Sequence, residues 1–337
     1  MQTISPEQTD ALCKRRCAFA LYALPGKDVE FCMQADGGTS AGADDGFMLA
    51  PYNGKSLLIR RELTTPPAAE AFPLLPITAP QHAATTRDEY HRLFEQYTAE
   101  LKRSGGLQKV VLARTQDEPI HQFSPTQAFL QACRNAPKAF NALFHTEEYG
   151  TWLCSTPELL LRREGDTWHT MALAGSRTNG NQPWDAKNLK EHALVAEHIL
   201  RCLTPTATDI VTNGPHTLAA GNSLEHLCTR ISFNMPADAL PSLLNTLPPT
   251  PAVSGYPTPE ARAFIQANPD IGRSCYAGYL GPVSAASTQL FVTLRCMQIF
   301  SYTCRLYAGG GLMPDSDELS EWAETAAKMQ AMKKLLS

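Results

Sequence analysis

Four strand-like runs follow one another closely in the middle of the chain, at 140–145, 151–155, 159–163 and 168–173. Each is rich in the aliphatic, aromatic and β-branched residues that strands favour. Turns of only a few residues join them, such as residues 164–166. A parallel crossover needs about a dozen residues or more, so joins this short favour antiparallel pairing. The runs therefore predict largely antiparallel strand pairing rather than the regular βαβ order of a doubly wound fold.

Helical patterns flank these runs. Thr86 and Glu89 have the spacing of a capping box, and apolar residues then recur at helical intervals as far as Leu101. Other elements are expected from periodicity and turn signals, with helices at 125–135, 186–203 and 315–336 and strands at 17–24, 56–59, 109–114, 276–282 and within 289–305. The proline-rich segment 64–80 is expected to cross the surface between an N-terminal portion and the main body.

Composition limits the class of protein and its partners. With 337 residues, 43% hydrophobic and 18% charged, the chain is globular rather than disordered. A net charge of -4 gives no general reason to expect nucleic acid or an anionic membrane as partner. The longest apolar run, at 18–24, is too short to span a bilayer, and the first residues lack the pattern of a signal peptide. Ten cysteines without a CxxC pair indicate reduced thiols and a cytoplasmic protein, and no apolar stripe is left over for an interface, so a monomer is expected.

Glu158 is the first candidate for a chemical role. It follows Pro157 and precedes three leucines, at 159–161. A carboxylate drawn into apolar surroundings has a raised pKa and can donate a proton. On position alone, a surface carboxylate at a turn is the commoner case, so this hypothesis depends on the rest of the chain.

Two of the predicted helices carry further carboxylates. Glu321, Glu324 and Lys328 are spaced three and four residues apart, which places them on one helical face. Glu191 lies on the helix predicted at 186–203. Such residues are most often solvated ion pairs. Carboxylates from two separate helices would also suit Mg²⁺, which prefers oxygen ligands.

The remaining candidates are basic residues and glycines. Lys109 opens an apolar strand, where it is either a solvated strand end or a buried group whose neutral form could act as a base. Arg295 could pair with a carboxylate in bidentate fashion. Glycine segments at 174–176 and 309–311 are expected to be tight turns whose backbone N–H groups can approach a ligand. Neither GxGxxG nor GxxxxGK[ST] occurs, so nothing indicates a dinucleotide site or a P-loop.

Nine short segments occur in an order that resembles the chorismate-utilising enzymes, the family of isochorismate, salicylate, anthranilate and aminodeoxychorismate synthases. They are KVVLAR (109–114), STPELLLRR (155–163), LAGSR (173–177), KEH (190–192), PTPAVSGYP (249–257), YAGYLG (276–281), VTLRC (292–296), YAGGGL (307–312) and EWAETAAK (321–328). They cover roughly residues 85 to 335, and their shared order is far more specific than any one of them.

The resemblance implies an α+β fold of two stacked, mostly antiparallel β-sheets flanked by helices, with the site in a cleft between them. Residues 1–80 would be a short, divergent N-terminal portion of the same fold, and residues 81–337 the chorismate-binding catalytic domain. It also implies chorismate as substrate and Mg²⁺ as cofactor.

The resemblance assigns a role to each candidate residue. Lys109 matches the general base and Glu158 the general acid. The implied Mg²⁺ ligands are Glu191 and Glu324, with Glu321 close by through water. The implied substrate contacts are Tyr276, Arg295, Lys328 and the backbone of Gly309 at the enolpyruvyl carboxylate, and Gly175 and Ser176 along the ring carboxylate.

The residue at position 109 separates the branches of this family. Members that add ammonia typically carry glutamine there, whereas members that add water carry lysine, so Lys109 implies water as nucleophile and isochorismate as product, made for menaquinone or for a siderophore. The alternative is a salicylate synthase, which goes on to eliminate pyruvate. The family usually has histidine where Pro248 stands, and its absence favours isochorismate as the final product. A non-catalytic relic is a third hypothesis, and the joint presence of Lys109, Glu158, Glu191 and Glu324 argues against it.

Overall fold

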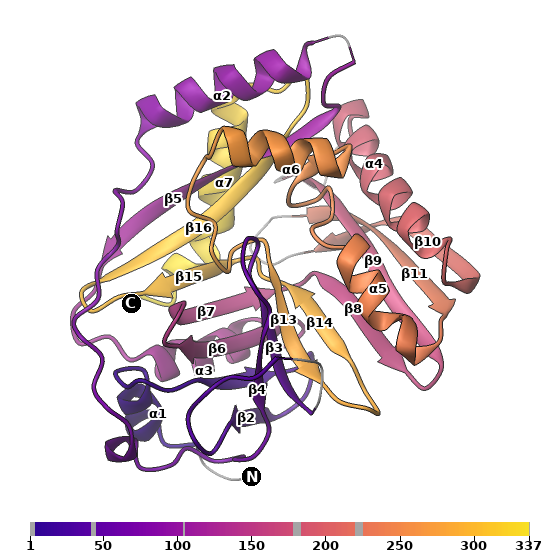
Figure 1. Ribbon diagram of the computed structural model, residues 1–337. Helices are drawn as coiled ribbons and strands as arrows, with labels where there is room; N and C mark the ends of the chain where they lie inside the picture. Colours follow the sequence, from indigo (N-terminus) through magenta and orange to yellow (C-terminus); the bar gives the residue numbers. More distant parts are fainter. Residues whose placement is uncertain (1–3, 42–44, 104, 178–182, 220–224, 337) are drawn as a thin grey trace.

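The structure is a computed structural model that describes residues 4–41, 45–103, 105–177, 183–219 and 225–336. Two sheets of eight strands each form the body of the molecule (Figure 1). The first sheet has the spatial order β12 (Gly255–Tyr256), β5 (Lys109–Pro119), β16 (Thr303–Leu312), β15 (Cys296–Ile299), β7 (Gly150–Thr156), β6 (Phe140–Thr146), β1 (Phe19–Ala23) and β2 (Val29–Met33). The second has the order β10 (Thr208–Ala219), β11 (Glu225–Asn234), β9 (Thr167–Arg177), β8 (Leu159–Glu164), β14 (Gln289–Val292), β13 (Tyr279–Val283), β3 (Gly46–Ala50) and β4 (Leu57–Arg60).

The strand pairs described in both sheets are antiparallel, which confirms the predicted α+β fold class. The four predicted central runs are β6 to β9, but they do not form one sheet, because β6 and β7 belong to the first sheet and β8 and β9 to the second. The N-terminal strands are likewise divided, with β1 and β2 at the end of the first sheet and β3 and β4 at the end of the second.

Helices lie outside the two sheets. They are α1 (Pro6–Leu12), α2 (Arg87–Leu101), α3 (Pro125–Asn135), α4 (Ala186–Leu203), α5 (Leu240–Thr246), α6 (Thr258–Ala267) and α7 (Glu318–Lys333), with short 3-10 helices at Ala69–Ala71 and Ala237–Ala239. The capping box predicted at the start of α2 is present, since Thr86 Oγ1 accepts from Glu89 N and the Glu89 carboxylate accepts from Thr86 N. None of the helices in the described ranges is long and apolar enough to cross a membrane.

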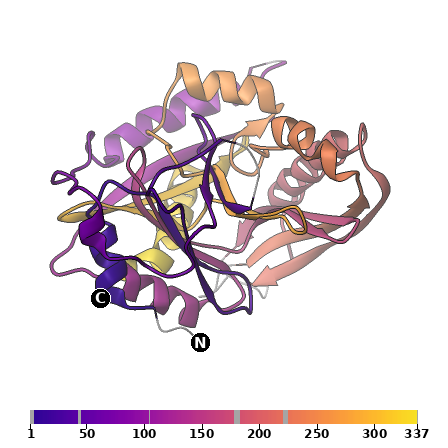
Figure 2. The same cartoon turned by 60° about the horizontal axis from the view of Figure 1, so that its bottom comes forward.

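The main core lies between the sheets. The rings of Phe140 and Phe291, one from each sheet, stack in parallel with centroids 4.2 Å apart. Trp152 and Trp168 are buried in the same cluster. A second core on the outer face of the first sheet packs strand residues such as Leu143 against α1, α3 and α7, and Figure 2 shows the indigo α1 beside α3. These layers place the start of β5 near α4, and they pack β9 against α4 and β16 against α7.

Both glycine segments predicted to be tight turns lie inside strands, so this prediction was wrong. Residues 309–311 belong to β16 and pair with β5 over their whole length. Gly175 lies in β9 at a bulge, where the register with β11 shifts between His226 and Leu227, and its φ is +78°. A bulge needs a residue that accepts positive φ, and in β16 the glycines leave room for neighbouring side chains.

All ten cysteines lie in the described ranges as free thiols.

Candidate active site

Lys109 is buried at the start of β5. Its side chain is 0% exposed, and Nζ lies 2.9 Å from Oε1 of Glu191 on α4. The lysine is therefore an internal group and not a solvated strand end. An ammonium in this position is held by the carboxylate that faces it.

The glycines of β16 make room for the side chains around Lys109. A Cβ on Gly309 would lie 2.7 Å from the hydroxyl of Tyr276. One on Gly310 would lie 2.6 Å from Oε2 of Glu321. One on Gly311 would lie 2.2 Å from Glu191 Oε1 and 2.8 Å from Cε of the lysine. Real Cβ atoms do not approach other atoms so closely, which explains why this strand carries three glycines in a row.

Two more predicted carboxylates enter the site from α7. Glu321 is buried, 2% exposed, and pairs with Nζ of Lys187 on α4. Glu324 Oε1 lies 2.6 Å from Nζ of Lys328, one helical turn further on. Nζ of Lys328 also donates to the carbonyl of Gly309, at 2.8 Å. Helices α4 and α7 are thus joined by charged side chains at the end of β16.

Glu158 lies at the entrance to β8, with 3% of its surface exposed. Burial raises the pKa of its carboxyl to about 8, against the lowering effect of Lys109, Lys328 and Arg295. Three cations, from β5, from α7 and from the connection between β14 and β15, therefore act on this one acid. A carboxyl with this pKa carries its proton at neutral pH, and the raised pKa agrees with the expectation for a carboxylate in apolar surroundings.

His226 links Arg295 to the segment of Gly175 and Ser176, and the sequence analysis did not select it. Its Nε2 lies 2.9 Å from Nη2 of Arg295. Its Nδ1 lies 3.0 Å from Ser176 Oγ and 3.2 Å from the carbonyl oxygen of Gly175. Arginine can only donate, so Nε2 accepts and Nδ1 carries the ring proton. Burial, with Arg295 and Lys328, lowers the pKa of His226 to about 3, so the ring is neutral.

Ser176 is also tied to α4. Its backbone N–H donates to Oδ1 of Asn188, at 2.9 Å, and Asn188 in turn donates to the N-cap residue Asp185. The bulge at Gly175 is therefore held against the first turn of α4. This N–H is engaged within the protein, so it differs from the free backbone donor that the sequence suggested.

The predicted site residues thus fall into linked groups of contacts, and the Glu158 carboxyl is linked to them through the charges of Lys109, Lys328 and Arg295. Each of three carboxylates faces a lysine ammonium, the pairs being Glu191 with Lys109, Glu321 with Lys187, and Glu324 with Lys328. Within the described ranges, no three acidic, histidine or cysteine side chains have the spacing of a metal-ligand group. The donors nevertheless suit Mg²⁺ in charge and chemistry, because they are carboxylate oxygens beside backbone that carries no Cβ.

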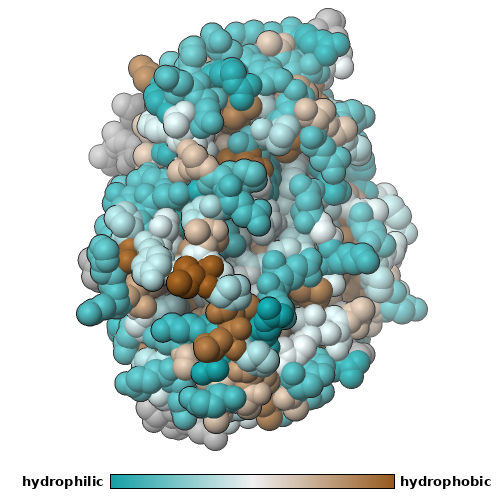
Figure 3. All heavy atoms as spheres, turned by 60° about the vertical axis from the view of Figure 1, so that its left-hand side comes forward, coloured by the Kyte–Doolittle hydropathy of each residue, from teal (hydrophilic) through white to brown (hydrophobic). Residues whose placement is uncertain are grey.

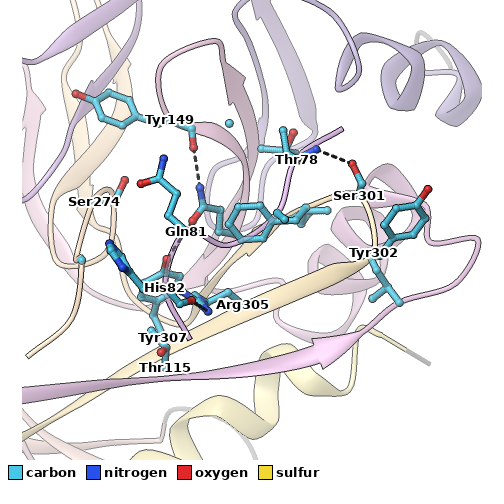
Figure 4. Close-up of a pocket in the computed structure, with 18 of the residues that line it drawn as sticks. Thr78, Gln81, His82, Thr115, Tyr149, Ser274, Ser301, Tyr302, Arg305 and Tyr307 are labelled. Atoms are coloured by element: carbon cyan, nitrogen blue, oxygen red, sulfur yellow. Dashed lines mark hydrogen bonds between the residues drawn. The ribbon is translucent and has the colours of Figure 1, made fainter. Parts of the chain in front are cut away.

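A large cavity of about 1670 Å³ lies away from these residues. Segment 74–85 passes along it, and it is lined by Tyr149, Ser274 and Arg305, among others (Figure 4). The segment is attached by hydrogen bonds such as the one from Thr78 N to Ser301 Oγ, at 3.0 Å. Figure 3 shows exposed apolar side chains scattered among polar ones on the left-hand face of Figure 1. The lining of this cavity contains none of the carboxylates and lysines described above.

The family described as chorismate binding enzyme matches residues 59–337. The chain belongs to this family.

Three curated relatives show how far the similarity extends. The Escherichia coli protein named isochorismate synthase MenF is 32% identical over 278 residues, which is 76% of this chain and 63% of that protein. The Pseudomonas aeruginosa protein named salicylate biosynthesis isochorismate synthase is 31% identical over 322 residues, 87% of this chain and 63% of its own length. The Bacillus subtilis protein named isochorismate synthase DhbC is 30% identical over 287 residues, 79% of this chain and 70% of its own length. The chain spans a little under two thirds of the first two relatives.

Solved structures share the fold. The menaquinone-specific isochorismate synthase MenF of Escherichia coli aligns with a TM-score of 0.78 at 21% identity, covering 98% of this chain and 91% of that one. A putative 2,3-dihydroxybenzoate-specific isochorismate synthase of Bacillus anthracis aligns at 0.79 and 22% identity, covering 98% and 99%. Anthranilate synthase component I of Streptococcus pneumoniae aligns at 0.68 and 14% identity, covering 93% and 89%.

Proposed function

We propose that this protein is an isochorismate synthase, which reversibly converts chorismate to isochorismate in a Mg²⁺-dependent reaction. The observation that carries the proposal is the pair of buried groups at the starts of β5 and β8. Lys109 is a fully buried amine, and Glu158 is a buried carboxyl whose pKa is raised to about 8 by burial. Relatives at about 30% identity carry the name isochorismate synthase, which supports the same reaction.

The two groups serve opposite proton transfers. Lys109 acts in its neutral amine form and accepts a proton from a water molecule as the water oxygen bonds to C2 of the ring. The ring double bonds shift, the bond between C4 and its hydroxyl breaks, and Glu158 supplies the proton with which that hydroxyl leaves as water. One hydroxyl replaces another, so the reaction is close to balanced and runs in both directions. A final proton transfer from the lysine to the acid restores the starting state.

Charged side chains position the substrate. Arg295 and Lys328 both act on Glu158, so they lie within reach of a substrate bound beside it. We assign them, with the hydroxyl of Tyr276 beside Gly309, to the enolpyruvyl carboxylate. Neutral His226 accepts a hydrogen bond from Arg295 and so fixes the orientation of its guanidinium group.

Mg²⁺ would be held by Glu191 and Glu324, with Glu321 through water. When bound, it supplies positive charge that neutralises the ring carboxylate and stabilises negative charge developing on the ring. The lysines that face these carboxylates carry the compensating charge when no divalent ion is present.

Product analysis tests the proposal. Purified protein is incubated with chorismate, with and without Mg²⁺, and the products are separated while pyruvate is assayed in parallel. We expect isochorismate without pyruvate, and only with the metal. Salicylate with an equal amount of pyruvate would identify a salicylate synthase instead. No conversion under either condition would contradict both assignments.

The raised pKa of Glu158 predicts a pH dependence of turnover. The value of kcat/KM should fall about tenfold per pH unit above pH 8, because the carboxyl then loses the proton that it donates. The pKa is higher in the folded protein than the ordinary value of 4.5, so the folded protein binds more protons between these two values. The free energy of unfolding contributed by this group is therefore full at low pH and falls as pH rises towards 8.

The variant Glu158→Gln should remove this slope of stability with pH and abolish the activity. Glu164→Gln is the matched control, because Glu164 lies at the far end of β8 with 58% of its side chain exposed. Denaturant unfolding at several pH values and a pH–rate profile measure both effects. A wild-type profile in Glu158→Gln would remove this residue from its role.

Adding a methyl group to Gly311 should disrupt the site. In Gly311→Ala the new Cβ would clash with Glu191 and with the stem of Lys109, which have to move. We expect kcat to fall about 100-fold, because displacements of about 1 Å have effects of that size. Gly272→Ala is the matched control, since a Cβ there meets nothing within 4 Å. Steady-state kinetics on the two folded variants measure the effect, and equal rates would contradict the close packing at β16.

The cytoplasmic location and the monomeric state expected from composition stay predictions. Size-exclusion chromatography with light scattering would test the second.

A further inference from the structure

Lys187 holds a position in this site that the proposed reaction does not use. It lies in the first turn of α4, one helical turn before Glu191, and its side chain reaches across to α7. There its ammonium group pairs with Oε1 of Glu321, which also accepts a hydrogen bond of 2.8 Å from Ser316 Oγ. The other oxygen, Oε2, lies over Gly310.

Glu321, the partner of Lys187, is a buried carboxylate that needs a positive charge beside it. The Glu321 side chain is only 2% exposed, whereas that of Lys187 is 26% exposed. Glu324 lies one turn further along α7 and adds a second negative charge nearby. A buried carboxylate left without a cation is strongly destabilising, so one positive charge has to be present beside Glu321.

Three carboxylates and three ammonium groups balance in this cluster. Lys109 has the role of base, and Lys328 also binds the backbone of β16. A divalent ion that enters the cluster adds two positive charges beside the ammonium groups of Lys187 and Lys328. Like charges repel at this range, so each resident ammonium weakens the binding of the ion.

We propose that Lys187 is a built-in counter-cation that sets the Mg²⁺ affinity of the site. It holds Glu321 in place across α4 and α7 when no divalent ion is bound, and its charge weakens metal binding. This inference rests on the metal site of the proposed function, but it concerns the substrate-free protein and requires no turnover.

The variant Lys187→Met tests it, because methionine keeps most of the apolar stem and removes the charge. Without divalent ions, its melting temperature should be lower than that of the wild type, since Glu321 loses its partner. Its Mg²⁺ affinity should be higher by roughly tenfold, because one repulsive charge has gone. Saturating Mg²⁺ should therefore raise its melting temperature more than that of the wild type.

Three further variants separate charge from packing. Lys187→Gln can still donate a hydrogen bond to Glu321 but carries no charge, so it should also bind Mg²⁺ more tightly, and it serves if the methionine variant does not fold. Lys187→Arg keeps the charge and should have an affinity near that of the wild type. Lys190→Met removes a charge from an exposed position on the same helix and should leave the affinity nearly unchanged.

The measurement is a MgCl₂ titration of each substrate-free protein, followed by melting temperature and by calorimetry, with NaCl at matched ionic strength as reference. Unchanged or weaker Mg²⁺ binding in both uncharged variants, beside saturable binding by the wild type, would overturn the role of Lys187 alone. The absence of saturable Mg²⁺ binding in the wild type would overturn the metal site of the proposed function, and this inference with it.

Discussion

Replacing Lys109 by alanine is expected to lower kcat for chorismate conversion by roughly 10²- to 10⁴-fold, the range that a general base contributes. The reason is that Lys109 is the only group that accepts the proton of the attacking water in the proposed mechanism. Its side chain is 0% exposed. Steady-state kinetics with chorismate and Mg²⁺ measure the loss. The melting temperature of the variant is recorded in parallel, because alanine also leaves Glu191 without its partner.

Two further variants test whether the loss of activity comes from the amino group of Lys109. Lys109→Gln retains much of the side-chain volume and has no basic nitrogen, so it should be as inactive as the alanine variant. Lys102→Ala, at an exposed position that ends α2, should have wild-type rates. Activity near that of the wild type in either Lys109 variant would show that another group accepts the proton.

Replacing Arg273 by methionine is expected to reduce the free energy of unfolding by about 3–5 kcal/mol, the cost of leaving a buried charge unpaired. Arg273 and Asp270 form an ion pair with side chains 1% and 0% exposed. The guanidinium group also donates to the carbonyls of Val253, at 2.7 Å, and Val111, at 2.8 Å. Asp270 accepts from the backbone of Ala113, at 2.9 Å. The pair thus joins the segment before β12 to the strand that begins at the proposed base.

Denaturant unfolding measures this loss directly. Arg201→Met is the control, because its ion pair with Glu197 has side chains 65% and 54% exposed. Exposed pairs contribute about 0–1 kcal/mol, so this variant should be close to the wild type. Equal effects of the two substitutions would mean that the buried pair contributes no more than a surface one.

Local patterns predicted much of the fold. Short joins predicted antiparallel strands, and the capping box at Thr86 marked the start of α2 correctly. The assignment of neighbouring strands to two different sheets could not be predicted. Only Pro157 and Glu158 separate β7 from β8, and so short a join is typical of strands that pair with each other. The antiparallel pair of β10 and β11 was also missed. Nearly all of β10 is exposed, so its sequence lacks the apolar alternation by which strands are recognised.

The candidate site shows the same limit. Residues with a chemical signal of their own, such as Glu158 before three leucines, could be selected from the sequence. His226 and Lys187 could not, because their roles depend on contacts across strands and helices. His226 faces Ser176 only through the register of β11 with β9, and Lys187 meets Glu321 only because the fold brings the first turns of α4 and α7 within reach of these side chains. The glycines of β16 were assigned to a turn because a run of glycine is typical of turns, whereas here it leaves room for neighbouring side chains.

The most direct test of the central claim is to run the reaction with Mg²⁺ in ¹⁸O-enriched water and analyse the product by mass spectrometry. If Lys109 activates a water molecule at C2 and Glu158 releases the C4 hydroxyl, each isochorismate formed carries one solvent oxygen, at C2, and no pyruvate appears. Isochorismate without the label would contradict water as the nucleophile. Salicylate with equal pyruvate would contradict isochorismate as the final product.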